Sequence, residues 1–243
     1  RAMAAELRVA APGGAIHDAG MDFMKWLNSL DELLYEVMSW LLFFPITLWR
    51  SAIHPFRTME EIEAQTLLPD DQQYAALLSP PLFLALALLL AHAVSTALGQ
   101  TDAIVANQHG LASLVSDNFS ALVLRVVVFA AFPLFLAARL VRGCGMKLDR
   151  VSLRQPFYEQ CYPAAVFALG LSLGTSLALV AVAPVHLAGR ALIVASIIYF
   201  FAVETRWFAM RRVFGLLRAF VQVALGLLEG AAFMLLVGFL LTR

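Results

Sequence analysis

Three ionisable residues stand inside long apolar runs and are the residues best placed to do chemistry: Glu229, Arg125 and His92. Desolvation favours the neutral form of a carboxyl group, so Glu229 is a candidate proton or cation site. The alternative is a structural carboxyl that is neutral or hydrogen-bonded to a neighbouring helix. His92 is interpreted as an imidazole hydrogen-bonded between helices, or as part of a proton path with Glu229.

Arg125 is the predicted partner of Glu229, because no other acidic residue in the apolar runs is clear of a helix end. The alternative is that its side chain extends outward to the membrane surface. Arg125 lies roughly 9 Å inside its run and Glu229 about 15–18 Å from either end of its own, at 1.5 Å per residue. Depth therefore argues mildly against direct contact.

Small residues at helical spacing form two G-x-x-x-G patterns, Gly170 with Gly174 and Gly226 with Gly230. Small residues let helices approach closely, so these helices are predicted to pack against each other or against another subunit. The first pattern also matches the hydrolase signature G-x-S-x-G through Ser172. That signature requires a strand–turn–helix elbow, which the middle of a helix cannot form. We therefore favour packing over catalysis there and predict no enzyme.

A basic stretch follows the fourth apolar run and contains Arg211, Arg212 and Arg218. These cations could bind anionic lipid headgroups, at about 1 kcal/mol each, or could simply determine topology, which we favour. Glu204 is predicted to pair with them locally in the cytosol. The five histidines and the two cysteines show no metal-ligand spacing, so no metal site and no cofactor are predicted.

The elements that position these residues are predicted to be membrane helices. Of 243 residues, 61% are hydrophobic and 14% charged, and the mean hydropathy is +0.81. A soluble domain of this size could not bury so much apolar surface. Seventeen Lys and Arg balance seventeen Asp and Glu, which excludes a nucleic-acid binder, since that class needs a basic excess. The composition indicates an integral membrane protein whose first partner is the lipid bilayer.

Five apolar runs are long enough to cross about 30 Å of hydrocarbon, and they lie at 82–98, 119–138, 163–183, 187–203 and 219–241. Fourteen of the 17 Lys and Arg fall on one alternate set of connections, which the positive-inside rule assigns to the cytoplasm. The predicted fold is an all-α bundle of five spans over 82–241. Its N-terminus is cytoplasmic and its C-terminus outside, in a membrane expected to be the bacterial inner membrane.

Residues 24–81 are predicted to be cytosolic or interfacial, after a poorly patterned extension at 1–23. The clean apolar stretch 38–49 would be about 18 Å long as a helix, too short to span, and Pro45 is predicted to kink it. An amphipathic helix in the membrane interface is therefore expected, with a sixth span as the alternative. Thr58 followed by a glutamate three residues later predicts a second helix beginning near Thr58.

Two short stretches resemble the Yip1-type family: Pro-Phe-Arg-x-x-x-x-Ile at 55–62, and Leu-Ser-Pro-Pro-Leu-Phe at 78–83, which enters the first span. The predicted five spans and inward N-terminus are similar as well. The resemblance implies a non-enzymatic membrane protein and supplies no catalytic residues. We therefore favour a role in assembly, scaffolding or trafficking-type membrane organisation, as a homo-oligomer or with a membrane-protein partner. The alternative is a small oligomeric channel or transporter that uses Glu229.

Overall fold

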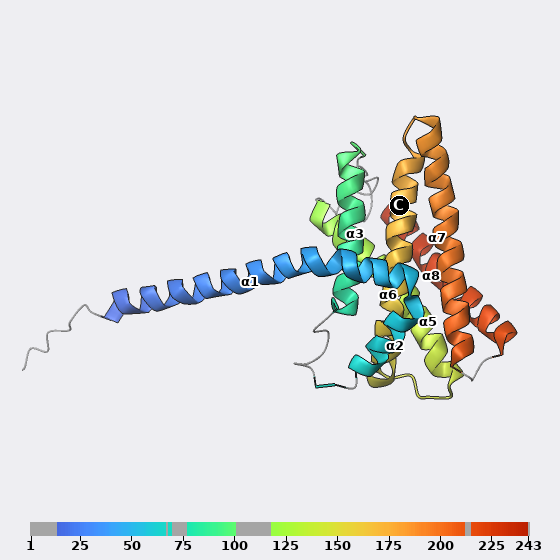
Figure 1. The fold of residues 1–243 in the computed structure, drawn as a ribbon, viewed down its shortest axis with the longest axis horizontal. Helices are drawn as coiled ribbons and strands as arrows, with labels where there is room; N and C mark the ends of the chain where they lie inside the picture. Colours follow the sequence, from blue (N-terminus) through green and yellow to red (C-terminus); the bar gives the residue numbers. More distant parts are fainter. Residues whose placement is uncertain (1–13, 67, 70–76, 101–117, 212–214, 243) are drawn as a thin grey trace, which may run out of the picture. The chain divides into compact units, whose positions relative to one another are not determined.

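A computed structural model describes residues 14–66, 68–69, 77–100, 118–211 and 215–242 (Figure 1). Within these residues the structure is entirely helical, with seven helices and no strand. The helices are α1 (Gly14–Ile53), α2 (Pro55–Gln65), α3 (Pro80–Ala97), α5 (Asn118–Gly143), α6 (Arg150–Ala178), α7 (Ala183–Met210) and α8 (Leu216–Thr242).

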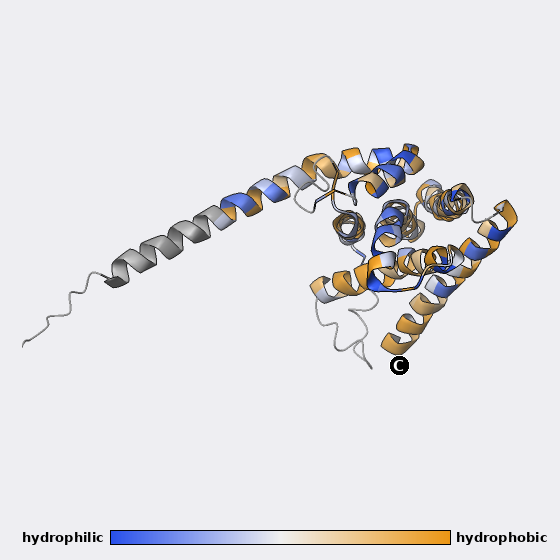
Figure 2. Ribbon diagram, turned by 90° about the horizontal axis from the view of Figure 1, so that it is seen from below, coloured by the Kyte–Doolittle hydropathy of each residue, from blue (hydrophilic) through white to orange (hydrophobic). Residues whose placement is uncertain are grey.

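Six of these helices are long and apolar enough to cross a membrane: Ser29–Ile53 within α1, and α3, α5, α6, α7 and α8. Hydrophobic residues predominate along α8, the helix that ends at C in Figure 2. These helices indicate an integral membrane protein. The sixth candidate is the N-terminal stretch for which the sequence predicted an interfacial helix.

The length argument against a span in α1 was wrong, because the helix extends far beyond 38–49. Glu36 does not interrupt it, and its carboxylate accepts a hydrogen bond from Trp40 Nε1 at 3.0 Å. Pro45 lies inside the same helix and does not end it. Residues 14–23, predicted to be poorly patterned, also belong to α1, and residues 1–13 lie outside the described residues.

The chain divides into two compact units, residues 1–43 and 44–243. The last residues of α1 and all of α2 therefore belong to the same unit as the five later helices. In this unit Thr47 and Ser51 of α1 are fully buried. Tyr199 of α7 donates a hydrogen bond to the backbone oxygen of Ser51 at 2.6 Å.

The short helix α2 begins at Pro55, three residues before the predicted start at Thr58. Proline suits the first turn of a helix, because its φ angle is already helical and its missing N–H is not needed there. Thr58 consequently lies one turn inside the helix, where its hydroxyl donates to the backbone oxygen of His54 at 3.2 Å. Pro55, Thr58, Met59 and Ile62 form the buried face of α2.

The helix α6 is the centre of the larger unit and packs against α2, α3, α5 and α7. Its Phe167 stacks on Phe200 of α7, with ring centroids 4.7 Å apart, and meets Phe132 of α5 edge-on at 5.6 Å. Tyr162, also on α6, stacks on Phe83 of α3 at 5.3 Å. The outermost helix, α8, packs against α5 and α7.

The start of α6 differs most from the prediction, which placed it at Pro163. The helix begins at Arg150, and Pro163 lies buried in its interior. Asp149 caps it, since its side chain accepts hydrogen bonds from the backbone nitrogens of Val151 and Ser152 at 3.0 and 2.9 Å. These hydrogen bonds lower the pKa of Asp149, and the one from the backbone nitrogen of Ser152 has the largest effect. A search for apolar runs misses this first half of α6 because it is polar.

The helices α3, α5, α6, α7 and α8 alternate in direction (Figure 1). Two connections therefore lie at the same end of this unit as α2, namely those between α5 and α6 and between α7 and α8. We call this the α2 end. Arg142, Arg150 and Arg211 all belong to helix termini at this end.

Candidate functional site

Glu229 of α8 is bound by an arginine on α5. The guanidinium of Arg139 donates from Nε to Oε2 of Glu229 at 2.9 Å and from Nη2 to Oε1 at 2.6 Å. Its third nitrogen, Nη1, donates to Oε1 of Gln222, also on α8, at 2.9 Å. The side chain of Arg139 is 17% exposed and that of Glu229 is 44% exposed. The result is a bidentate ion pair, a geometry that makes such pairs strong.

The partner of Glu229 is therefore Arg139 and not Arg125. The apolar run at 119–138 ends one residue before Arg139, but α5 continues to Gly143 and carries Arg139 on its last turns. A signal for the correct pairing was present on α8. Gln222, Gly226 and Glu229 follow one another at spacings of four and three, so they share one face of the helix.

Two glycines bring α8 close enough to α5 for this ion pair to form. A Cβ atom added at Gly226 would lie 2.7 Å from Cδ2 of Leu136, and one added at Gly230 would lie 2.6 Å from Cδ1 of Phe132. Real Cβ atoms are essentially never so close to another heavy atom. The second G-x-x-x-G pattern thus lies against α5.

The first G-x-x-x-G pattern lies against α7 and not against the helix that carries the second. A Cβ atom at Gly174 would lie 2.9 Å from the backbone oxygen of Gly189, and one at Gly170 would overlap the side chain of Ser196. Gly189 is the residue that the sequence analysis missed. A Cβ atom there would meet the backbone nitrogen of Ala178 and lie 2.7 Å from the backbone oxygen of Gly174.

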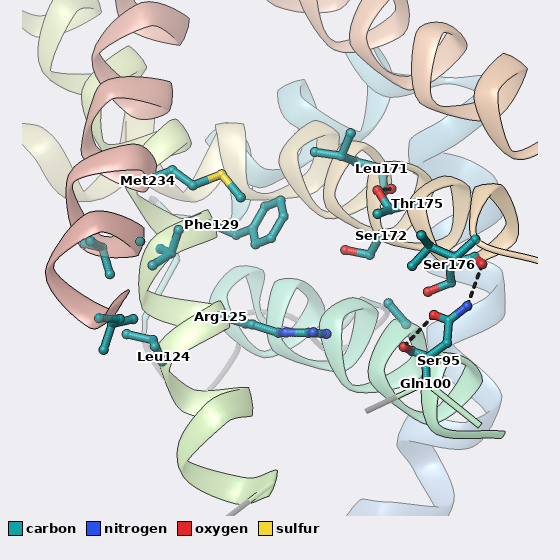
Figure 3. A pocket seen from close by; sticks show the side chains of 16 residues that line it. Ser95, Gln100, Leu124, Arg125, Phe129, Leu171, Ser172, Thr175, Ser176 and Met234 are labelled. Carbon is teal, nitrogen blue, oxygen red and sulfur yellow. Dashed lines mark hydrogen bonds between the residues drawn. The ribbon is translucent and has the colours of Figure 1, made fainter. Parts of the chain in front are cut away.

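Arg125 lines a cavity at the end of the unit opposite α2, to which α3, α5, α6 and α8 contribute residues (Figure 3). Its side chain points into the cavity, toward Ser172 of α6. It therefore does not pair with Glu229, whose two oxygens are bound by Arg139; that its side chain extends outward to the membrane surface stays a prediction. His92 is half-buried on α3 and is not among the residues that line this cavity.

A third polar cluster lies at the α2 end and is built around Arg211. Its guanidinium binds Glu63 of α2 through Nη1 at 2.7 Å and Glu159 of α6 through Nη2 at 2.7 Å. The side chain of Glu159 is 0% exposed, and its other oxygen accepts from Gln155 at 3.0 Å. Arg211 therefore joins three helices through these two ion pairs, and its predicted binding of a lipid headgroup stays a prediction.

The other two members of the predicted basic cluster differ from Arg211. Arg218 is exposed at the start of α8. Arg212 lies outside the described residues. The prediction of headgroup binding thus remains open for Arg218.

Glu204 of α7 is fully buried, which contradicts the prediction that it pairs with nearby arginines in the cytosol. Neither of its carboxylate oxygens has a hydrogen-bond partner, and the same is true of both side-chain atoms of Gln160 on α6. Buried polar groups are normally hydrogen-bonded, so the burial of these four side-chain atoms costs free energy.

The chemistry of these three clusters is electrostatic. Within the part of the chain that the structure describes, no three His, Cys, Asp or Glu residues lie where they could hold a metal ion. Comparison with protein-family models, with curated proteins and with solved structures finds no match to this chain. The fold and the clusters together define a polytopic α-helical membrane protein with ionic links between its helices.

Proposed function

We propose that this chain is a non-catalytic multi-pass membrane protein that acts in assembly, scaffolding or trafficking-type membrane organisation. The observation that supports this proposal is the state of Glu229, whose two oxygens are both bound by Arg139. A carboxylate held in this way links α5 to α8. It is poorly suited to bind and release protons or cations, which a channel or transporter built on Glu229 would require.

The flank of α8 beside the ion pair is the surface on which we expect assembly to occur. We define this α8 flank as Leu225, Leu228, Ala232 and Leu236, which are all exposed. Glu229, at its edge, lies about 20 Å from each end of α8 at 1.5 Å per residue. Lipid solvates leucine well, but a half-exposed ion pair in the middle of a span is costly against hydrocarbon. We infer that a second copy or another membrane protein covers this flank.

The proposed topology follows from the charges. We propose that α3, α5, α6, α7 and α8 are the spans and that the α2 end faces the cytoplasm of a bacterial inner membrane. The support is that the connections rich in Lys and Arg belong to this end, as the positive-inside rule requires. The stretch Ser29–Ile53 of α1 then lies in the membrane interface or forms a sixth span. The Yip1-type resemblance implies the same class of protein.

The test of assembly is mild detergent extraction from native membranes followed by mass spectrometry of the intact complex. We expect a second copy or a stoichiometric partner chain on the wild-type protein. Ala232→Trp places a large side chain in the middle of the α8 flank, so the second copy or partner chain should be lost from this variant. Ile198→Trp is the matched control, because Ile198 is 62% exposed on a different helix, α7. This variant should keep the second copy or partner chain. A wild-type protein that is always monomeric would contradict the proposal.

The channel or transporter alternative is tested with the same purified protein in liposomes. Under the proposal, Glu229→Gln leaves proton and cation flux at the level of protein-free liposomes, as in the wild type. A flux that the wild type supports and Glu229→Gln abolishes would favour the alternative.

A further inference from the structure

The cavity into which Arg125 points has the size of a ligand site. Its volume is about 430 Å³, within the range of roughly 300–1,000 Å³ that is usual for small-molecule sites. It lies where α3 and α6 end and α5 begins, and the last turns of α8 form one side of it. Four helices thus contribute to it, and it is part of the bundle itself.

One of the described residues that line the cavity is an arginine. Arg125 is the only ionisable residue among the 16 described residues that line it, and its guanidinium shares the space with the hydroxyl of Ser172 (Figure 3). An arginine that faces the interior of a membrane bundle is the arrangement expected of a functional cation. Arg125 has a further contact in the structure, but a guanidinium has five N–H donors and can hold an anion as well.

One wall of the cavity is fixed by hydrogen bonds. Ser95, at the end of α3, donates to Oε1 of Gln100 at 3.1 Å. The amide nitrogen of Gln100 donates to the backbone oxygen of Ser176 on α6 at 2.7 Å. These bonds hold the end of α3 on α6, so the cavity exists before any ligand binds, and preorganisation of this kind favours affinity.

The rest of the lining is apolar and lies mainly to one side of Arg125. Phe129 of α5 and Met234 of α8 lie beside each other on this side of the cavity (Figure 3). Val237 and Leu241 continue the apolar surface along α8. A ligand that fits both parts has an anionic group at one end and a hydrocarbon chain at the other.

We propose that this cavity binds the head of an anionic lipid, meaning a phosphate or carboxylate carried on an acyl chain. The guanidinium of Arg125 binds the oxygens of the anion, and the hydroxyl of Ser172 donates to them. The first part of the acyl chain lies along the apolar lining that Phe129 and Met234 contribute. The proposal concerns a ligand and is independent of whether the α8 flank binds a partner.

The test uses the full chain purified in an uncharged detergent and titrated with dioleoylphosphatidylglycerol. Bound lipid is counted by native mass spectrometry, and thermal stability is measured in parallel. Dioleoylphosphatidylcholine and inorganic phosphate are the comparison probes, because the first lacks net charge and the second lacks a chain. We expect one saturable molecule of phosphatidylglycerol per chain, and weak or no binding of the other two.

Three variants assign the binding to the cavity. Arg125→Gln should weaken it about tenfold to a hundredfold, the usual effect of losing a charged hydrogen bond. Met234→Trp fills the apolar side of the cavity, keeps the charge of Arg125, and should also abolish saturable binding. This variant provides the test if Arg125→Gln does not fold. Arg190→Gln is the matched control, because Arg190 is exposed on α7 and lies outside the cavity lining, and it should bind as the wild type does.

Each contrary result overturns the proposal. Equal binding of phosphatidylcholine would remove the role of the anion. Equal stabilisation by inorganic phosphate would show that the ligand is a free anion and not a lipid. Unchanged binding in both Arg125→Gln and Met234→Trp would place the lipid elsewhere on the protein.

Discussion

At the scale of residues, the ionic groups of this protein differ in what surrounds them. The ion pair of Arg139 and Glu229 is partly exposed, since the side chain of Glu229 is 44% exposed. The carboxylate of Glu159 is instead completely buried and depends on Arg211 for its charge partner. Glu204 is also completely buried and has no hydrogen-bond partner at either oxygen. The three carboxylates should therefore respond differently to substitution.

Removal of Arg211 should strongly destabilise the protein. In Arg211→Ala the buried carboxylate of Glu159 loses its counter-ion, a change that costs about 3–5 kcal/mol at buried ion pairs. The measurement is the free energy of unfolding, or the melting temperature, of the purified protein in detergent. Arg218→Ala removes an exposed arginine and should change stability by less than about 0.5 kcal/mol. Equal effects of the two substitutions would show that Arg211 does not stabilise Glu159.

Replacement of Glu204 by leucine should increase the stability of the protein, the opposite of the effect expected for Arg211→Ala. A buried polar group without a hydrogen bond costs about 1–3 kcal/mol, and Glu204→Leu removes it while nearly preserving volume. We expect a higher melting temperature in the same assay. A lower one would mean that the carboxylate makes a stabilising interaction inside the core, which would turn attention to Glu204 as a binding group.

At the scale of elements, glycines determine how closely the helices approach. Gly174 and Gly189 allow the backbones of α6 and α7 to touch, and Gly226 and Gly230 place α8 against α5. The ion pair of Arg139 with Glu229 depends on the second approach. These positions are therefore structural, and their effect on function is indirect.

Gly189→Ala should destabilise the protein although alanine is the better helix former. The new Cβ atom would meet the backbone of α6, which cannot move aside as a flexible side chain can, and overpacking of this kind costs about 1–3 kcal/mol. Gly238→Ala is the matched control, because nothing lies within 4 Å of the new atom. It should be neutral or stabilising by up to about 1 kcal/mol. Similar melting temperatures for the two variants would contradict the close approach of α6 and α7.

At the scale of the whole molecule, the larger unit is organised around α6. The aromatic side chains of α6 meet those of α3, α5 and α7, and Arg211 links α2 to this centre through Glu159. The helix α2 is consequently part of the bundle and not a free arm. Its side of the membrane then determines the orientation of the entire unit.

The two native cysteines can report this orientation. Cys144 is half-buried in the connection after α5, whereas Cys161 is fully buried in α6. A membrane-impermeant maleimide should therefore label Cys144 in inverted vesicles and leave it unlabelled in intact spheroplasts. Cys144→Ser should abolish the labelling. Labelling in spheroplasts would reverse the proposed topology.

A single added cysteine then decides between five and six spans. Lys25→Cys in the Cys144→Ser background lies before the stretch Ser29–Ile53. Labelling from the cytoplasmic side would place that stretch in the interface, and labelling from the opposite side would make it a sixth span.

Composition and hydropathy were enough to predict the class of protein and the approximate place of the five later apolar helices. Hydropathy and the distribution of Lys and Arg act along the chain, so they can be read without a structure. The same reading failed where a helix continues into polar residues, as α5 does to Arg139 and α6 does from Arg150.

The contacts between side chains of different helices could not be predicted from the sequence. In the folded protein Glu229 pairs with Arg139, the side chain of Arg125 points into a cavity, and Glu204 is buried. The physical reason is that these outcomes depend on which helices are neighbours and on their register. Both are fixed by contacts between residues far apart in the chain, such as Gly230 with Phe132. No local pattern records those contacts.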